Sequence, residues 1–389
     1  MSKNLFIVAG EASADMHAAT LLKALKKKNP EIIVSGVGGS ALLSEGVNLL
    51  LNSEKLNVVG ISDWWDRVGE VLGGYKKVTR YLDGNKPDYA ILLDLPDFNL
   101  RLAKKLKKNG VPVIYYISPQ VWAWRKYRIR QIKRDIDLML VVFPFEKEFY
   151  DRQGVPVVFV GHPLLEAVKP KSSFRDHSQI VEEPRVVLLP GSRRSEVKFH
   201  GPILNELIAL IKQHYPKSKI KVPVARTLSV DFVKQYVHSS EVIFDETNSH
   251  EVIEWGDVAV VASGTATLET ALIGTPFVLF YRVSSLSAWV WQNLMSYRGF
   301  IGMPNLLHQK EIVKEFFQEG ATAEKLFEET DKLIQDQTYR QNQVSSLLQC
   351  RSKLGDEGAN LRAAETIHQF FLDREKNNRS QPSNAVCKS

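Results

Sequence analysis

Short apolar runs recur along the chain, and most are followed by a segment with helical spacing. In the first half they occupy residues 4–9, 31–37, 89–93, 111–117, 138–142 and 157–160. In the second half they occupy residues 185–189, 220–224, 242–244, 258–261 and 277–280. Strands that are apolar throughout are typical of parallel sheets covered by helices on both faces. We therefore predict an α/β protein with two doubly wound, Rossmann-like domains.

A polar stretch separates the two halves. Residues 169–179 are mostly polar, and a second break follows at Glu182-Glu-Pro184. We predict an N-terminal domain over residues 1–168 and a C-terminal domain over residues 185–345. The two domains should face each other, with the active site in the cleft between them.

The end of the chain is predicted to leave the second domain. We expect helices within residues 346–374 to pack back on an N-terminal domain, followed by a polar, disordered tail over residues 375–389. That N-terminal domain is the chain's own or a partner's, so a homodimer formed by exchange stays open.

Composition excludes several classes of protein. No apolar run approaches the roughly 20 residues of a membrane-spanning helix, and the run that begins at Leu5 is too short for a signal peptide. Two cysteines, Cys350 and Cys387, cannot build a disulfide framework or a zinc cluster, which favours a reducing cytoplasm. The net charge of +7 suits anionic substrates or an anionic membrane surface. Without a recognisable motif it does not indicate nucleic-acid binding.

Two loops have the composition of anion sites. Leu189-Pro-Gly-Ser-Arg193 and Ser263-Gly-Thr-Ala-Thr-Leu-Glu269 each join an apolar run to a helical segment. Free N–H groups and the helix dipole favour negative charge at such a junction, and Arg193 adds donors for phosphate oxygens. An ordinary turn with solvated arginines is the alternative for one loop, but the recurrence favours a diphosphate. Neither loop is a Walker or Gly-x-Gly-x-x-Gly motif, which favours a nucleotide-sugar over ATP or NAD.

Seven motifs then occur in a fixed order. They are Gly10-Glu-Ala-Ser-Ala-Asp15, Leu95-Pro-Asp-Phe-Asn99, Ser118-Pro-Gln-Val-Trp-Ala-Trp124, Val160-Gly-His-Pro-Leu164, Leu189-Pro-Gly-Ser-Arg193, Ser263-Gly-Thr-Ala-Thr-Leu-Glu269 and Met303-Pro-Asn305. Together they resemble the lipid-A-disaccharide synthases, inverting glycosyltransferases of the GT-B type, over nearly the whole chain. One departure is Ala14, which stands where the family's first loop usually has a second glycine.

The resemblance implies a reaction of lipid A biosynthesis in Gram-negative bacteria. UDP-2,3-diacylglucosamine is joined to 2,3-diacylglucosamine 1-phosphate, which gives a β-1,6-linked disaccharide 1-phosphate and UDP. It implies neither a catalytic metal nor a cofactor.

The acceptor side is expected at the strand ends of the N-terminal domain. A sugar hydroxyl is a weak nucleophile, so a carboxylate should take its proton, and Asp97 matches the family's proposed base. A helix N-cap is an equally common role for an Asp at such a position. Asp94 and Asp88 are rivals, although Asp88 precedes its strand and should lie at the far edge of the sheet. The other residues predicted to line the acceptor side are Ser13, Asp15 and Glu11.

The donor side is expected in the C-terminal domain. Stabilisation of the leaving UDP is assigned to Ser192, Arg193, Thr265 and Thr267, and Glu269 is predicted to bind the ribose. Asn305 matches the family's nucleotide-contacting Asn, although Asn after Pro is also ordinary turn chemistry.

An aromatic segment provides a candidate membrane contact. Its apolar residues fall near one helical face, and cationic residues flank them. They are Trp64, Trp65, Val68, Val71 and Leu72. A helix packed in the core is the commoner alternative, but the lipid substrate favours peripheral association with the cytoplasmic face of the inner membrane.

Two other functions stay open at this point. Another UDP-sugar enzyme, such as a UDP-N-acetylglucosamine epimerase or a peptidoglycan glycosyltransferase, would use the same diphosphate loops. A protein that binds a nucleotide-sugar or a lipid without turnover would also fit, because fold does not determine function.

Overall fold

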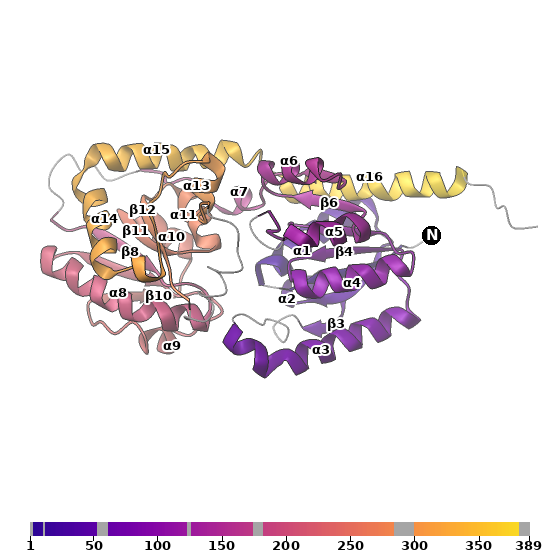
Figure 1. Ribbon diagram of the computed structural model, residues 1–389, viewed down its shortest axis with the longest axis horizontal. Coiled ribbons are helices and arrows are strands. Elements are labelled where there is room, and N and C mark those ends of the chain that lie inside the picture. Colours follow the sequence, from indigo (N-terminus) through magenta and orange to yellow (C-terminus); the bar gives the residue numbers. More distant parts are fainter. Residues whose placement is uncertain are drawn as a thin grey trace, which may run out of the picture. The chain divides into compact units, whose positions relative to one another are not determined.

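The computed structural model describes residues 3–10, 12–52, 61–122, 126–173, 182–283 and 299–380. It divides into two compact units (Figure 1). Unit 1 contains Met1–Pro163 together with Asp356–Ser389, and unit 2 contains Leu164–Gly355.

Unit 1 is built on a seven-stranded parallel sheet with the order β3-β2-β1-β4-β5-β6-β7. The strands are β1 (Asn4–Ala9), β2 (Ile33–Gly38), β3 (Asn48–Asn52), β4 (Tyr89–Leu93), β5 (Val113–Tyr116), β6 (Leu138–Val141) and β7 (Val157–Phe159). The helices are α1 (Ala12–Lys28), α2 (Ser40–Ser44), α3 (Ile61–Gly84), α4 (Pro96–Lys108), η2 (Lys126–Arg128), α5 (Ile129–Asp135), α6 (Pro144–Arg152) and α16 (Ala359–Ser380). The strand order reverses between β1 and β4, where doubly wound folds bind ligands.

Unit 2 contains a six-stranded parallel sheet with the order β10-β9-β8-β11-β12-β13. Its strands are β8 (Arg185–Leu189), β9 (Lys219–Pro223), β10 (Val242–Asp245), β11 (Val258–Ala262), β12 (Phe277–Tyr281) and β13 (Glu315–Phe317). Its helices are α7 (Leu164–Ala167), α8 (Arg194–His214), α9 (Val230–Lys234), α10 (Ser249–Trp255), α11 (Thr265–Ile273), α13 (Met303–His308), η3 (Gln318–Gly320), α14 (Ala323–Gln335) and α15 (Gln337–Lys353). Here the order reverses between β8 and β11.

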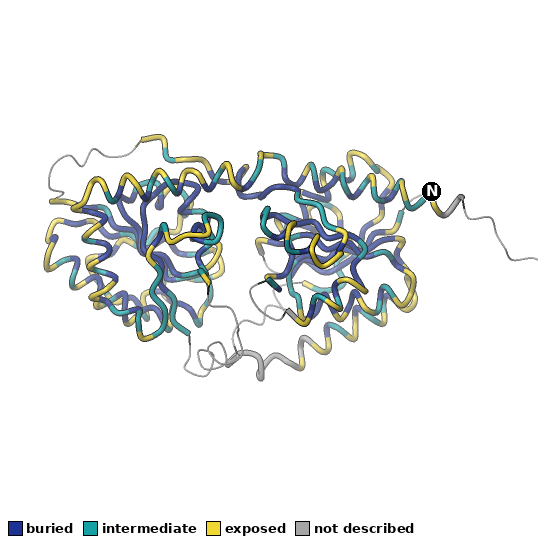
Figure 2. Tube along the Cα trace, turned by 45° about the horizontal axis from the view of Figure 1, so that its top comes forward, coloured by how far each residue is buried: buried dark blue, intermediate teal, exposed yellow. Residues whose placement is uncertain are grey.

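Each sheet forms the centre of a hydrophobic core. The central strands β1, β4, β8 and β11 are buried along almost their whole length, and the exposed positions follow the outer faces of the helices (Figure 2). Full burial of a Leu, Val or Phe side chain stabilises a fold by about 1.5–3 kcal/mol, so the apolar runs favour these positions over any edge. The predicted class, two Rossmann-like α/β sheets, is confirmed.

The division of the chain differs in detail from the expected boundaries. The units separate after Pro163 and after Gly355, whereas the polar stretch 169–184 and residue 346 were expected. Helix α15 belongs to unit 2, and α16 alone returns to unit 1, where it packs against α1. Arg362 of α16 donates a hydrogen bond to the Val160 carbonyl at 2.8 Å, and the Phe371 ring lies 4.0 Å from that of Tyr89.

Within the ranges given above, no helix is long and apolar enough to cross a membrane. The same ranges hold no group of three or more His, Cys, Asp or Glu side chains arranged to hold a metal ion.

Candidate active site

The loops after β1 and β4 meet at the point where the strand order of unit 1 reverses. Ala9 is paired with Leu93, so Gly10 and the turn after β4 leave the sheet side by side. A Cβ atom on Gly10 would lie 2.0 Å from Leu95 Cγ. Only glycine leaves room for the Leu95 side chain here, which explains the glycine of the first motif in terms of packing.

The turn after β4 has an unusual backbone. Asp94 has φ 56° and Leu95 has φ 41°, and both lie in the left-handed region that non-glycine residues rarely adopt. Such residues cost roughly 1–3 kcal/mol each and persist only where other contacts hold them. The Asp94 carbonyl accepts hydrogen bonds from the buried Tyr115 hydroxyl and from the Asn99 amide, each at 2.6 Å. Two neighbouring elements therefore hold this turn in place.

Asp97 lies in the first turn of α4, directly after the strained turn. Leu95 is the N-cap of α4, so Asp97 does not have the capping role that was its alternative. The Asp97 side chain is 64% exposed and forms an ion pair with Arg128, whose own side chain is only 8% exposed. An accessible carboxylate at the carboxyl edge of the sheet can accept a proton from a bound hydroxyl.

The remaining carboxylates of unit 1 differ in environment. Asp15 is buried, and its two oxygens accept hydrogen bonds from the backbone of Gly39 at 2.7 Å and Ala41 at 2.8 Å. It therefore caps the start of α2 in this structure. Asp88 accepts a hydrogen bond from the Asn4 N–H at 2.8 Å at the opposite edge of the sheet, as expected.

The first loop continues into α1 without a need for a second glycine. Ala14 lies within α1 and is buried, so its methyl group is accommodated in an ordinary helix. Ser13 is exposed in the first turn of that helix. Glu11 lies outside the described residues.

A buried acid lies behind the loop that follows β5. Glu146, near the start of α6, accepts hydrogen bonds from the Ser118 hydroxyl at 2.6 Å and from the Trp122 indole at 3.3 Å. Its other oxygen accepts from the Phe143 N–H at 3.2 Å. Burial raises the pKa of Glu146 to about 7, although these donors oppose the shift.

Two histidines of unit 1 are neutral at physiological pH. Burial lowers the pKa of His162 to about 3, and the nearby His17 contributes to the shift. Burial also lowers the pKa of His17 to about 4. The His162 ring lies 4.9 Å from that of Phe143, so a neutral, packed imidazole fits a structural role.

In unit 2, the two predicted diphosphate loops flank the reversal of strand order between β8 and β11. Val261 of β11 is paired with Leu189 of β8, so Pro190-Gly-Ser192 and Ser263-Gly-Thr265 leave the sheet at the same edge. Parallel sheets of this kind bind ligands at the carboxyl edge beside the reversal. The structure thus brings together the residues assigned to UDP from both loops.

The first of these loops already holds a carboxylate. Glu196 accepts hydrogen bonds from the backbone N–H groups of Ser192 at 3.0 Å and Arg193 at 3.2 Å, and its other oxygen lies 3.0 Å from the Arg193 guanidinium. Gly191 has φ 113°, and a Cβ there would lie 2.4 Å from the same carboxylate. Arg193, not Ser192, is the N-cap of α8.

A buried histidine ties this loop to β12. His200 Nδ1 lies 2.6 Å from the Pro190 carbonyl, and Nε2 lies 3.1 Å from the Arg282 N–H. Burial lowers the pKa of His200. We assign the neutral ring with its proton on Nδ1, because Nδ1 then donates to Pro190 and Nε2 accepts from Arg282.

The second loop begins α11. Gly264 has φ 153° with open space beside it, and Thr265 is exposed at the helix start. Thr267 is buried, and its hydroxyl donates to the Gly264 carbonyl at 2.8 Å. Glu269 is half-buried and lies 3.5 Å from His250 of α10. Thr265 is therefore accessible to a ligand, while the Thr267 hydroxyl serves the loop itself.

Asn305 is buried in α13 and bonded on both ends of its amide. Its oxygen accepts from the N–H groups of Ile312 at 2.7 Å and Val313 at 2.9 Å. Its nitrogen donates to Glu315 at 2.7 Å and to the Val313 carbonyl at 2.7 Å. In this structure Asn305 fastens α13 to the segment before β13, and its predicted contact with the nucleotide remains a prediction.

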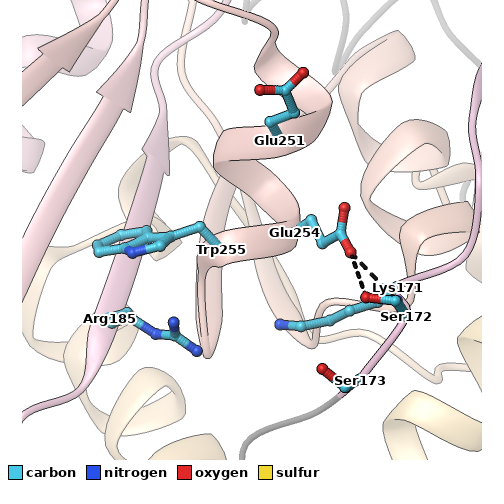
Figure 3. A pocket seen from close by; sticks show the side chains of 7 residues that line it. All are labelled: Lys171, Ser172, Ser173, Arg185, Glu251, Glu254 and Trp255. Carbon is cyan, nitrogen blue, oxygen red and sulfur yellow. Dashed lines mark hydrogen bonds between the residues drawn. The ribbon is translucent and has the colours of Figure 1, made fainter.

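A cavity of about 370 Å³ lies elsewhere in unit 2 (Figure 3). Arg185, the first residue of β8, lines it, so it lies at the amino edge of the sheet, opposite the diphosphate loops. Its charged groups are paired: Arg185 with Asp257 at 3.0 Å, and Lys171 with the Gly256 carbonyl at 2.6 Å. This cavity is not part of the candidate site.

The comparison with protein families decides which family the chain belongs to. A model described as lipid-A-disaccharide synthetase matches residues 5–370. The chain belongs to the lipid-A-disaccharide synthetase family. It is therefore a glycosyltransferase of lipid A biosynthesis, as the resemblance predicted.

Curated relatives of this family support the assignment. The lipid-A-disaccharide synthase of Myxococcus xanthus is 40% identical over 373 residues, which cover 94% of this chain and 97% of that protein. The enzyme of the same name from Nitrosococcus oceani is 40% identical over 359 residues, with 90% and 92% covered. These relatives favour the synthase family over the other UDP-sugar enzymes and over a binding protein.

Solved structures with the same architecture are more distant in sequence. The UDP complex of S. aureus MnaA has a TM-score of 0.63 at 15% identity and covers 95% of this chain and 97% of that one. UDP-GlcNAc 2-epimerase from Neisseria meningitidis bound to UDP-GlcNAc has a TM-score of 0.60 at 13% identity, with 95% and 100% covered. At such identities the likeness shows the fold alone, and it supports the two-domain GT-B type.

The structure describes only part of the aromatic segment that is predicted to contact the membrane. Helix α3 is formed over Ile61–Gly84, longer than the aromatic segment itself. Leu72 is 46% exposed. The side chains of Trp64, Trp65, Val68 and Val71 lie outside the described residues, so the membrane contact stays a prediction.

Sequence reasoning missed three residues that shape these edges: Arg128, Glu146 and Glu196. The two acids occupy the third position of their helices, the spacing of a capping box, which is a local signal. Arg128 had no such signal, because its partner Asp97 lies 31 residues away in the chain.

Proposed function

We propose that Asp97 is the general base with which this glycosyltransferase makes the lipid A disaccharide. The reaction joins UDP-2,3-diacylglucosamine to 2,3-diacylglucosamine 1-phosphate and releases UDP. The observation that carries the proposal is the placement of Asp97, which is exposed, follows a strained turn and lies at the carboxyl edge beside the reversal of strand order. Strained turns persist where a fold holds a functional group in place.

The chemistry follows from inversion. The acceptor 6-oxygen attacks the anomeric carbon of the donor while the bond from that carbon to the β-phosphate oxygen breaks. The hydroxyl proton passes to the Asp97 carboxylate, and the bonding pair leaves with UDP. A positioned base of this kind typically accelerates such a step by about 10²–10⁴.

We assign stabilisation of the departing UDP to the loops of unit 2 without a metal ion. Arg193, the Ser192 N–H and the helix start at Thr265 and Thr267 are the donors proposed for the diphosphate, and removal of one donor of this type typically costs about 10²–10³ in rate. Glu269 and Asn305 are proposed for the nucleoside.

The acceptor is assigned to unit 1. Ser13, Asp15, Glu11 and Asp94 are proposed to line its site, with Asp15 acting through the α2 backbone that it caps.

Peripheral binding to the cytoplasmic face of the inner membrane is proposed for α3. Exposure of Leu72 fits an apolar face directed to lipid, and the net charge of +7 favours anionic headgroups. Replacing Trp64 and Trp65 with Ser should reduce co-sedimentation with anionic vesicles. The homodimer remains a prediction that light scattering of the intact chain can test.

The test of the base compares wild type with Asp97→Asn and Asp94→Asn in mixed micelles that contain EDTA. We expect wild type to form disaccharide 1-phosphate and UDP, and Asp97→Asn to lose about 10²–10⁴ in kcat with UDP binding retained. Full activity of Asp97→Asn with loss in Asp94→Asn would move the base to Asp94. Loss of wild-type activity in EDTA that added Mg²⁺ restores would refute metal independence.

A further inference from the structure

Arg128 is a buried cation with one described partner. The residue is 7% exposed, at the end of η2, and among the described residues its hydrogen bonding is confined to the Asp97 carboxylate. A guanidinium has five N–H donors, and burial is costly unless most of them find acceptors. A single carboxylate oxygen leaves donors available for a second anion.

The neighbouring groups restrict which anion that is. The buried Tyr115 hydroxyl donates a hydrogen bond to the Asp94 carbonyl, and Asp94 and Arg128 both lie close enough to Tyr115 to act on its pKa, in opposite directions. Arg128 is thus a buried cation beside Asp97 at this edge of the sheet. An anionic group of the substrate can bind the Arg128 guanidinium here if it displaces the Asp97 carboxylate.

The acceptor sugar carries the two groups that match this pair. Its 1-phosphate and its 6-hydroxyl-bearing carbon are attached to the two carbons that flank the ring oxygen, so both lie along one edge of the sugar. A guanidinium binds phosphate through parallel, charge-assisted hydrogen bonds, whereas a hydroxyl needs a carboxylate to take its proton. Asp97 and Arg128 are in direct contact, as the two substrate groups require.

We propose that Arg128 binds the 1-phosphate of the acceptor and thereby releases the Asp97 carboxylate to the 6-hydroxyl. Without acceptor, Asp97 neutralises Arg128. With acceptor, the phosphate replaces Asp97 on the guanidinium, and the carboxylate oxygen that faced Arg128 accepts the hydroxyl proton. Arg128 is then the residue that makes the enzyme specific for a phosphorylated acceptor. This inference rests on the proposed role of Asp97.

The test measures kcat/KM for two acceptors, 2,3-diacylglucosamine with and without the 1-phosphate. The variants are Arg128→Gln, Arg128→Lys and the matched control Arg130→Gln, two residues further along on an exposed position of α5. We expect Arg128→Gln to lower the preference for the phosphorylated acceptor, measured as the ratio of the two kcat/KM values, by about 10- to 100-fold. Arg128→Lys should keep part of the preference, and Arg130→Gln all of it.

The readout is a ratio, so it does not depend on the total activity of a variant. An unchanged preference in Arg128→Gln refutes phosphate recognition. If both acceptors are then slowed equally, Arg128 only orients Asp97. If Arg128→Gln does not fold, as judged by its thermal melt and by UDP binding in unit 2, the Arg128→Lys ratio decides, and a full wild-type preference there refutes the bidentate contact.

Failure of the proposed base is a distinct result. An active Asp97→Asn enzyme removes Asp97 as the base. The Arg128→Gln variant keeps Asp97 intact. Its preference between the two acceptors therefore still shows whether the guanidinium binds the phosphate. If wild type and Arg128→Gln bind UDP with equal Kd, Arg128 recognises the acceptor phosphate and not the diphosphate of UDP. Weaker UDP binding by Arg128→Gln would contradict the inference.

Discussion

The carboxylate of Glu196 lies 3.0 Å from the guanidinium of Arg193 and also accepts the backbone N–H groups of Ser192 and Arg193. These are the donors assigned to the diphosphate of UDP. An internal anion therefore occupies these donors in the absence of ligand. On the proposed assignment, the diphosphate of UDP takes them over from Glu196.

Glu196→Ala should destabilise unit 2 in the absence of ligand. The variant removes the partner of two N–H groups at the start of α8, a loss of about 1–2 kcal/mol. UDP should restore part of this loss, because its diphosphate replaces the missing acceptor. Thermal unfolding with and without UDP measures both effects, and the shift caused by UDP should be larger in the variant than in wild type.

Glu206→Ala is the matched control, because Glu206 is exposed on the same helix. Its unfolding temperature and its response to UDP should equal those of wild type. A UDP-induced shift in Glu196→Ala no larger than that in wild type would show that the diphosphate does not use the Glu196 donors.

Gly10→Ala should disturb the turn that carries Asp97. The added methyl group would meet Leu95 Cγ at 2.0 Å, so the turn must move, at a cost of about 1–3 kcal/mol. We expect lower stability and a lower kcat. Adding Leu95→Ala removes the obstructing side chain, and the double variant should be more stable than the two single losses predict. Urea unfolding of the four proteins gives this interaction energy, and strict additivity would contradict the contact.

Glu146→Gln should remove a pH dependence of stability. Burial raises the pKa of Glu146 from 4.5 to about 7, so the folded state binds the proton more tightly than the unfolded state. Stability from this group is complete below pH 4.5 and is lost as pH rises towards about 7, by an amount on the order of 3 kcal/mol. The Gln side chain does not titrate, so the loss is absent.

The measurement is urea unfolding of both proteins from pH 4.5 to pH 8, taken as the difference between wild type and variant. The difference isolates Glu146 from His17 and His162, whose lowered pKa values make stability fall towards acid pH. Glu148→Gln, an exposed position on the same helix, is the control and should follow wild type. Parallel curves for wild type and Glu146→Gln would exclude the shifted pKa.

The fold was predictable because it depends on local patterns. The strands 4–9, 89–93 and 185–189 have the predicted bounds, since each is a continuous apolar run with a polar residue or a turn at its ends. Strands β3 and β13 were missed: neither has a fully buried position, so neither stands out as a buried apolar run. The two loops predicted to bind the diphosphate follow β8 and β11, as their small residues after apolar runs indicated.

The partners within the site were harder to predict. The contacts of Asp97 with Arg128 and of Ser118 with Glu146 join residues 31 and 28 positions apart, and sheet order brings them together. No periodicity in the sequence encodes such a pair. For the same reason the sequence predicted ligand contacts for Asp15 and Asn305. Only the structure shows that their side chains bind backbone N–H groups.

Variants of Asn305 can distinguish its structural role from a contact with the nucleotide. Asn305→Ala leaves the Ile312 and Val313 N–H groups without their acceptor and removes one of the donors to Glu315, so the free energy of unfolding should fall by about 2–4 kcal/mol. Asn305→Asp keeps the acceptor but places a second carboxylate beside Glu315, whose pKa burial already raises. Stability of Asn305→Asp should therefore fall more steeply than that of wild type as pH rises from about 5 to about 8, because the two acids lose their protons in contact.

Urea unfolding at the two pH values measures this, with Asn342→Asp on an exposed position of α15 as the control. Equal slopes for Asn305→Asp and wild type would show that the pair with Glu315 is not formed. The predicted contact of Asn305 with the nucleotide would then be favoured over a structural role.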